Sequence, residues 1–148
     1  MAMQHTPLLM SKIIDRGAKV APYEEIVTAT ENGVRRQTYK ETRDRAHQLA
    51  HALAEAGIAV GDRVGTFMWN GSRHLEAYQA CAGMGAVLHT LNIRLSEKDL
   101  EYIINHAEDQ IIIVDADILP LLEKLEGKMP TVRQVVIATE EGLSLIHI

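Results

Sequence analysis

Short apolar runs alternate with segments of helical periodicity between Gly61 and Asp115. Their length and β-branched content are typical of buried strands. In the segment before the third run, Leu100, Ile103 and Ile104 share one helical face, and Ser96 is placed to cap it. Helical crossovers between strands indicate a parallel sheet. The expected strands are Arg63–Asn70, Ala86–Asn92 and Gln110–Asp115, followed by Gln134–Thr139.

The segment before Gly61 has a different pattern. Asn32-Gly33 lies between two strand-like runs, Glu25–Thr30 and Val34–Thr38, which predicts an antiparallel hairpin. Thr38 and Glu41 have the spacing of a capping box for a long helix that ends at Gly57.

Two further helices complete the predicted elements. A short first helix is expected to be capped by Thr6, to have Pro7 at its first position and to stop at Gly17. Another amphipathic helix is expected at Ile118–Leu125. The predicted fold class is therefore α/β, a partial doubly wound and mainly parallel sheet with flanking helices, plus an N-terminal β-hairpin.

Composition excludes several classes of protein. The chain has 148 residues and a net charge of −5, which argues against a nucleic-acid partner. Its longest uncharged run, Ala77–Ile93, contains polar residues and glycines, so no integral membrane segment is expected. A single cysteine, Cys81, excludes an internal disulfide and suits a reducing compartment. We therefore expect a cytoplasmic protein, with Cys81 as a small core residue.

His47, His51 and Glu55 follow one another at intervals of four residues, which could place three zinc ligands in a row on a helix. The row lies off the apolar stripe of that helix, and the H-E-x-x-H pattern is absent. We interpret it as a solvated face, so no metal site is predicted.

Two glycine-containing stretches are candidates for phosphate-binding loops. Gly83-Met84-Gly85 falls between a helix and the next strand, the wrong order for a dinucleotide loop, so it is expected to end the helix and allow close packing. Asn70-Gly71-Ser72 has the right order but lacks lysine and further glycines, so a tight turn with Ser72 as cap is expected.

The ends of the predicted strands supply the candidate pocket residues, because α/β folds place ligands there. These candidates are Trp69, Asn70, His89 and Asn92. For His89 a satisfied core histidine is the default interpretation, and a pocket wall is the alternative. Asp115 and Asp117 are interpreted as loop-capping residues rather than a metal pair.

Several motifs resemble the N-terminal region of fatty acyl-CoA synthetases. These motifs are Trp69-Asn70, Gly83-Met84-Gly85-Ala86, Asn92-Ile93-Arg94-Leu95 and Tyr102-Ile103-Ile104-Asn105-His106-Ala107. The resemblance runs from Leu8 to Ala138 and is specific to the medium- and long-chain branch of the adenylate-forming superfamily. It implies an AMP-forming fatty acid–CoA ligase that uses ATP, Mg²⁺ and CoA when complete.

The resemblance also indicates which parts of such an enzyme are missing. The family's phosphate loop, close to T-S-G-T-T-G-x-P-K-G, has no counterpart in the sequence, and the later nucleotide motifs and catalytic lysine are absent. We therefore assign no catalytic or cofactor-binding residue and expect ATP, Mg²⁺ and CoA not to bind this chain. The first helix, with Leu9, Ile13 and Ile14 on one side, resembles the segment that long-chain members exchange between subunits, which implies a possible homodimer.

Residues 1–141 are expected to be an incomplete large domain whose partner is the rest of that domain. The tail 142–148 resembles translated adapter sequence, so we expect a non-native or truncated end. Such a chain should expose an unpaired strand edge and part of an apolar face. Two alternatives stay open: a free-standing α/β module that binds a small ligand, and a dimerisation or interaction domain.

Overall fold

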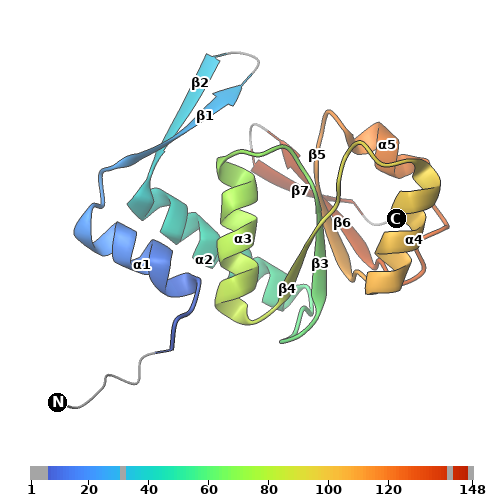
Figure 1. The fold of residues 1–148 in the computed structure, drawn as a ribbon, viewed down its shortest axis with the longest axis horizontal. Coiled ribbons are helices and arrows are strands. Elements are labelled where there is room, and N and C mark those ends of the chain that lie inside the picture. Colours follow the sequence, from blue (N-terminus) through green and yellow to red (C-terminus); the bar gives the residue numbers. More distant parts are fainter. Residues whose placement is uncertain (1–6, 31–32, 140–141, 147–148) are drawn as a thin grey trace.

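The structure, a computed structural model, describes residues 7–30, 33–139 and 142–146, the last group through its backbone alone. Two sheets are present in this part of the chain (Figure 1). The helices are α1 (Ser11–Val20), α2 (Tyr39–Glu55), α3 (Ser72–Met84), α4 (Glu97–Ala107) and α5 (Leu119–Glu123). The strands are β1 (Glu25–Thr30), β2 (Gly33–Thr38), β3 (Arg63–Phe67), β4 (Val87–Thr90), β5 (Ile111–Asp115), β6 (Gln134–Thr139) and β7 (Gly142–Ile146).

The larger sheet has the order β4-β3-β5-β6-β7, with the first four strands parallel to one another. Strand β3 lies between β4 and β5, so the chain runs outward from β3 to β4 and then crosses back to β5. The predicted parallel sheet is confirmed, and so is the separate antiparallel pair β1–β2, in which Thr30 faces Gly33. Asn32 of the predicted turn lies outside the described residues.

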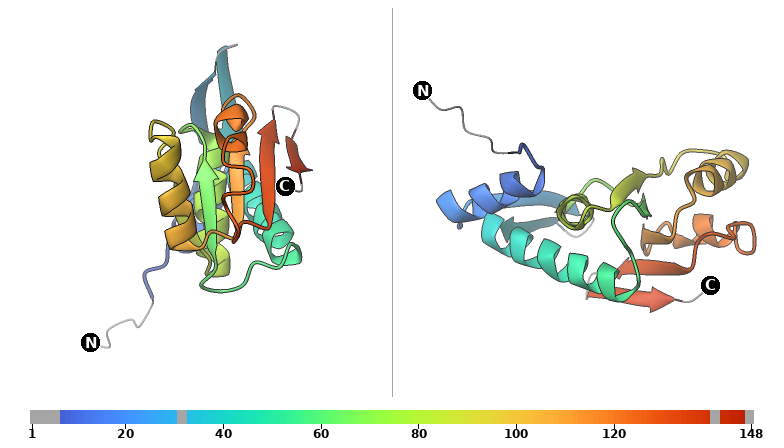
Figure 2. Two further views of the ribbon diagram at one scale, coloured as in Figure 1. Left: turned by 90° about the vertical axis from the view of Figure 1, so that its right-hand side faces the viewer. Right: turned by 90° about the horizontal axis from the view of Figure 1, so that it is seen from below.

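Helices cover both faces of this sheet, as Figure 2 shows from two sides. Side chains of β5 alternate between two cores: Ile111 and Ile113 pack with residues of α2 and α3, whereas Ile112 and Val114 pack with residues of α4 and α5. A parallel strand with helices on both faces is expected to be apolar throughout. This explains the continuous run of apolar residues in β5.

Strand β4 departs from that expectation. It is shorter than the predicted Ala86–Asn92, and its side chains are only partly buried, with Val87 48% exposed. In the part of the chain that the structure describes, β4 has a neighbour on one side only. The strand is therefore an outer edge of the sheet. Strands β3 and β5 also proved shorter than predicted, ending before Met68 and beginning after Gln110.

The prediction for the first helix was wrong at both ends. Helix α1 begins at Ser11 without a side-chain cap, Pro7 precedes it, and Gly17 lies inside it rather than after it. A side-chain carbon at Gly17 would lie 3.2 Å from the Tyr39 ring, so this glycine serves a close helix contact. Thr6 lies outside the described residues. Helix α5 is also shorter than the predicted Ile118–Leu125.

The predicted helix ends are largely confirmed. Thr38 Oγ1 accepts from the Glu41 amide, and the Glu41 carboxylate accepts from the Thr38 amide. Ser96 Oγ accepts from the Asp99 amide at the start of α4. Gly57 and Gly85 follow α2 and α3 with φ of 86° and 81°, which side chains other than glycine rarely adopt. No helix in the described ranges is long and apolar enough to cross a membrane.

The predicted unpaired edge at the end of the chain is only partly found. Strand β7 pairs antiparallel with β6, for example Ile137 with Ser144, so β6 is an inner strand and β7 is the outer one. Residues 142–146 therefore form a strand. That the tail 142–148 is non-native or truncated stays a prediction.

A buried carboxylate connects β2, α2 and α3. Glu76 of α3 has a side chain 6% exposed, and its carboxylate accepts two hydrogen bonds from Arg45 of α2, at 2.6 and 3.1 Å. It also accepts one from Gln37 of β2 at 2.8 Å, and Gln37 in turn donates to Thr42. The carboxylate also raises the pKa of the Arg45 guanidinium. Buried charge is stable only with such partners.

This network predicts the effect of removing Glu76. We expect Glu76→Ala to lower the free energy of unfolding by about 3 kcal/mol, because Gln37 then loses a buried acceptor and Arg45 loses its partner. The control Glu25→Ala breaks only the exposed pair with Arg36 and should cost less than about 1 kcal/mol. Urea unfolding followed by fluorescence measures both, and equal effects would contradict the prediction.

Candidate functional site

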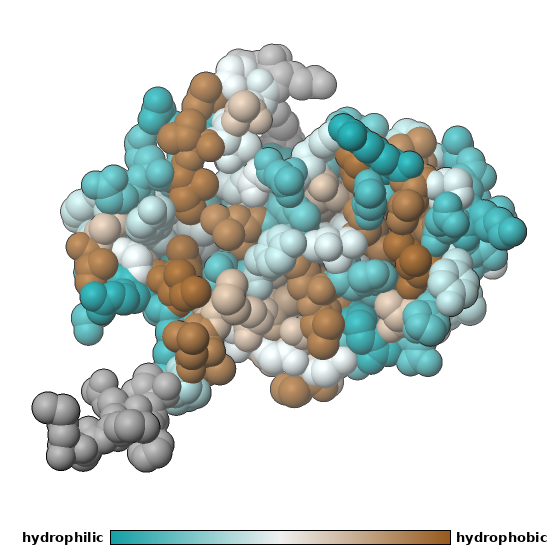
Figure 3. Space-filling view, in the orientation of Figure 1, coloured by the Kyte–Doolittle hydropathy of each residue, from teal (hydrophilic) through white to brown (hydrophobic). Residues whose placement is uncertain are grey.

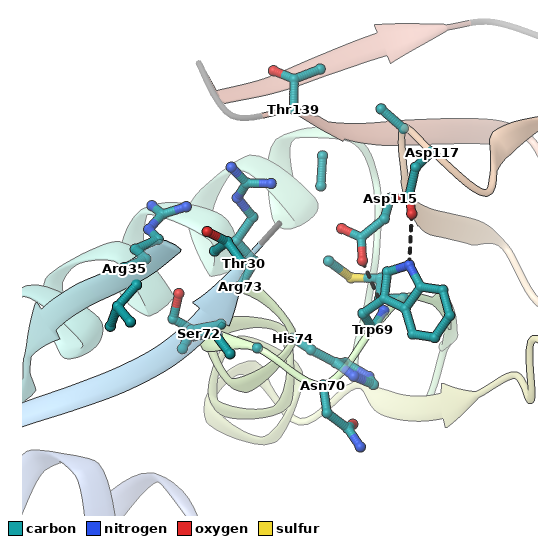
Figure 4. A pocket seen from close by; sticks show the side chains of 17 residues that line it. Thr30, Arg35, Trp69, Asn70, Ser72, Arg73, His74, Asp115, Asp117 and Thr139 are labelled. Atoms are coloured by element: carbon teal, nitrogen blue, oxygen red, sulfur yellow. Dashed lines mark hydrogen bonds between the residues drawn. The ribbon is translucent and has the colours of Figure 1, made fainter. Parts of the chain in front are cut away.

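The candidate site is a cleft at the carboxyl ends of the parallel strands. The chain leaves β3 toward α3 on one face of the sheet and leaves β5 toward α5 on the other. Such a divergence between adjacent strands is the topological switch point, where open α/β sheets bind ligands. A cleft of about 1010 Å³ opens here (Figure 4). Its walls are the ends of β3, β5 and β6, the start of α3, and the β1–β2 hairpin.

Trp69 is held across the switch point by two carboxylates. Its backbone amide donates to Asp115 Oδ2 and its indole Nε1–H donates to Asp117 Oδ2, each at 2.8 Å. The side chain is nevertheless 51% exposed and lines the cleft. The prediction that Asp115 and Asp117 cap a loop is thus refined: they bind the loop after β3 rather than their own. The indole is fixed in orientation while much of its surface stays accessible.

Burial shifts the pKa of two titratable groups that line the cleft. Burial raises the pKa of Asp115, and the hydrogen bond from the Trp69 amide partly opposes this rise. Burial lowers the pKa of His74, which is 6% exposed and lies with Nε2 2.9 Å from Thr66 Oγ1. A hydrogen bond with the Trp69 backbone partly opposes this lowering.

The opposite wall of the cleft is basic. Figure 4 shows the Arg35 guanidinium on the side away from the Trp69 indole, and the charge of Arg73 is close enough to Asp115 to oppose the rise in the pKa of that carboxyl. The two arginines come from β2 and from the first turn of α3. The predicted Ser72 cap is wrong: Gly71 holds the N-cap position, and the Ser72 amide donates to Thr28 Oγ1 of the hairpin at 3.1 Å. The hairpin therefore contacts the start of α3 directly.

The structure brings together only two of the four predicted pocket residues. Trp69 and Asn70 line the cleft, and their role as pocket walls stays a prediction. His89 lies on β4, with Nδ1 2.8 Å from Oδ2 of fully buried Asp109, and Asn92 accepts from the Arg94 amide in its own turn. Neither of these two is among the residues that line the cleft. Burial raises the pKa of Asp109, and His89 partly offsets this.

The remaining candidates occupy ordinary positions. His47, His51 and Glu55 are exposed on α2, with His47 Nε2 3.7 Å from an oxygen of Asp15. Within the described ranges, no three His, Cys, Asp or Glu side chains are grouped to hold a metal ion. Cys81 is a core residue, and burial raises its thiol pKa to about 12.

The two glycines near the end of α3 have different roles. Gly85 ends the helix in the left-handed region, as predicted. Gly83 is exposed, and a side chain there would meet nothing within 4 Å. The close approach occurs at Gly85 instead, where a side-chain carbon would lie 3.3 Å from the Val60 side chain.

Comparison with known proteins decides the family. The model of the AMP-binding enzyme family matches residues 14–145. The chain belongs to this family. It is 44% identical over 141 residues to a long-chain-fatty-acid–CoA ligase of Thermus thermophilus and 42% identical over 136 residues to a 3-methylmercaptopropionyl-CoA ligase of Ruegeria pomeroyi. These matches cover 95% and 91% of this chain but only 26% and 25% of the relatives.

Solved structures of the family have the same fold. The N-terminal domain of FACL13 from Mycobacterium tuberculosis matches with a TM-score of 0.82 at 24% identity, covering 89% of this chain and 34% of that one. The anthranilate CoA ligase AuaEII, in complex with anthranoyl-AMP, matches with a TM-score of 0.77 at 23% identity, covering 93% and 26%. The chain thus corresponds to the N-terminal region of acyl-CoA ligases and spans about a quarter of the length of these curated relatives.

Proposed function

We propose that this chain is the N-terminal part of an ATP-dependent fatty acid–CoA ligase. The complete enzyme would join a fatty carboxylate to ATP, releasing pyrophosphate, and then transfer the acyl group from the adenylate to the CoA thiol. The observation that supports this most is the 44% identity to a long-chain-fatty-acid–CoA ligase over 95% of the chain. ATP, Mg²⁺, CoA and a fatty acid are the ligands proposed for the complete enzyme, which we place in the cytoplasm.

The chain by itself is proposed to be inactive. Adenylate formation needs backbone amides and a metal ion around the β- and γ-phosphates. The sequence contains no glycine-rich run with lysine that could supply such a loop. Residues 1–141 would then be scaffold that completes an active site together with the rest of the domain. The tail 142–148 is proposed to be non-native or truncated.

We expect the purified chain to catalyse no fatty-acid-dependent exchange of labelled pyrophosphate into ATP, because the phosphate-binding elements are missing. The measurement compares the chain with a no-protein blank and with a full-length fatty acid–CoA ligase. Exchange above the blank that copurifies with the chain through repeated chromatography would contradict the proposal.

A homodimer through α1 is a second candidate role for this part of the molecule. Leu9 and Ile13 are 49% and 60% exposed, whereas Ile14 is partly buried against the neighbouring helices. Figure 3 shows patches of hydrophobic surface at this end of the molecule. Exposed apolar surface of this kind favours association. The alternative of a free-standing binding module has no comparable support, since the family's members match along their first quarter only.

Sedimentation over a concentration series tests the homodimer. We expect the wild-type chain to shift from monomer toward dimer as its concentration rises, and Ile13→Glu to stay monomeric, because a charge at the contact would have to be desolvated. Tyr102→Glu is the matched control, since Tyr102 is 66% exposed and lies on α4, at the opposite end of the molecule from α1 (Figure 1). A monomeric wild type, or equal weakening by both substitutions, would rule out this dimer.

A further inference from the structure

We propose that a groove between α1, α2 and α3 binds a small primary alkylamine, with its ammonium group directed to Gln79 and Asp15. None of the described residues lines both this groove and the cleft at the switch point. The inference goes beyond the ligase function and does not depend on it. The three helices contact one another, and Figure 2 shows α1 and α3 on the same side of α2. The groove has a volume of about 420 Å³, within the range of small-molecule sites.

Small side chains form the floor of this groove. Ala46, Ala50 and Ala54 follow one another at intervals of four residues on α2, so they share one face of that helix. Gly83 of α3 also lines the groove, and a side-chain carbon added there would meet nothing within 4 Å. Ile14 of α1 adds apolar surface beside the alanines. The hollow exists because no long side chain from α2 fills it, and its floor suits an alkyl chain.

Gln79 supplies an unsatisfied hydrogen-bond acceptor in the groove. It belongs to α3, lines the groove and is 8% exposed. Its side-chain oxygen Oε1 is buried and has no hydrogen-bond partner among the described residues. Buried polar atoms are usually satisfied, and an exception needs a cause such as a ligand or a bound water. An amide oxygen can only accept, so its partner must carry an N–H or O–H group.

The charges around the groove favour a cation over an anion. Asp15 of α1 lines the groove, whereas no lysine or arginine in the described ranges does. The lining histidines His47 and His51 are exposed, and His47 Nε2 lies 3.7 Å from Asp15 Oδ1. A carboxylate or phosphate would therefore meet two acceptors, Gln79 Oε1 and the Asp15 carboxylate, and no fixed positive charge. An ammonium group has three donors and complements both acceptors.

n-Butylamine is the simplest probe of this class, because it joins an ammonium group to a short alkyl chain. 1-Butanol keeps the chain and one donor but lacks the charge. Methylamine keeps the ammonium group without the chain, and butyrate replaces the ammonium group with an anion. Saturation-transfer NMR detects binding of each probe through the signals of the probe itself, so it measures weak binding to the unlabelled chain.

We expect saturable transfer to n-butylamine, and binding at least about tenfold weaker for 1-butanol, methylamine and butyrate. The alcohol lacks the charge, methylamine lacks the apolar contact, and butyrate would bring a carboxylate next to Gln79 Oε1 and Asp15. Butyrate that competes with n-butylamine and binds as tightly would overturn the proposal. Absence of saturable transfer to n-butylamine would also overturn it and would leave a bound water as the partner of Gln79.

Two glutamines on neighbouring helices give a matched pair of variants. Gln79→Met keeps the length of the side chain but removes Oε1, so we expect n-butylamine to bind about tenfold more weakly. Gln48→Met should leave binding unchanged, since Gln48 is exposed on α2 and does not line the groove. The urea midpoint of Gln79→Met should not fall, because the lost acceptor had no partner. A lower midpoint with unchanged binding would give Gln79 a structural role instead and contradict the proposal.

Asp15→Asn tests the charge, because it keeps the shape of the side chain and removes the carboxylate. We expect the preference for n-butylamine over 1-butanol to fall from about tenfold to about threefold or less. An undiminished preference in this variant would contradict the role of Asp15.

Adjacent positions near the end of α3 test the groove itself. Gly83→Leu places a side chain where the wild type has open space, so we expect n-butylamine to bind at least about tenfold more weakly. Ala82→Leu is the control, since Ala82 is exposed and does not line the groove. Circular dichroism should show both variants folded, because leucine is a good helix former. Wild-type binding by Gly83→Leu would place the amine elsewhere and contradict the proposal.

Discussion

The buried carboxylate of Glu76 is the interaction on which the arrangement of the N-terminal half depends. Its three hydrogen bonds join α3 to Arg45 of α2 and to Gln37 of β2, three elements that have separate positions along the chain. Helix α3 packs on the sheet through Ala77, Ala80 and Cys81, so the hairpin is connected to the sheet through the same helix. A charged group buried in this way tolerates little displacement, because each lost partner costs free energy.

The position of the cleft follows from this constraint. Gln37 holds β2 against α3, and the Ser72 amide binds Thr28 of β1, so both hairpin strands contact the first half of α3. On the other side, Trp69 joins the end of β3 to the loop after β5. The cleft lies between these two sets of contacts. Its basic wall and its aromatic wall are therefore each fixed by polar contacts, while the two hydrophobic cores fix the sheet beneath them.

Local chemistry was readable from the sequence, and contacts between distant residues were not. The capping box of Thr38 and Glu41, the Ser96 cap and the β5 strand each depend on neighbouring residues or on periodicity, and all were predicted correctly. The alternation of strand-like and helical segments predicted the fold class. The place of β3 between β4 and β5 depends on the direction of each crossover, which no short pattern specifies.

The candidate site was predicted only in part for the same reason. Trp69 and Asn70 follow a strand, which marked them as candidates, but Arg35, His74 and Glu76 carry no local signal. The hydrogen bond between Trp69 and Asp117 spans 48 residues, and that between Arg45 and Glu76 spans 31.

We propose above all that this chain supplies scaffold and needs the rest of its domain. Co-expression with the C-terminal portion of the Thermus thermophilus ligase tests this most directly. We predict a stable complex that forms acyl-adenylate. A chain that remains a cooperatively folded monomer and does not bind that portion would contradict the claim.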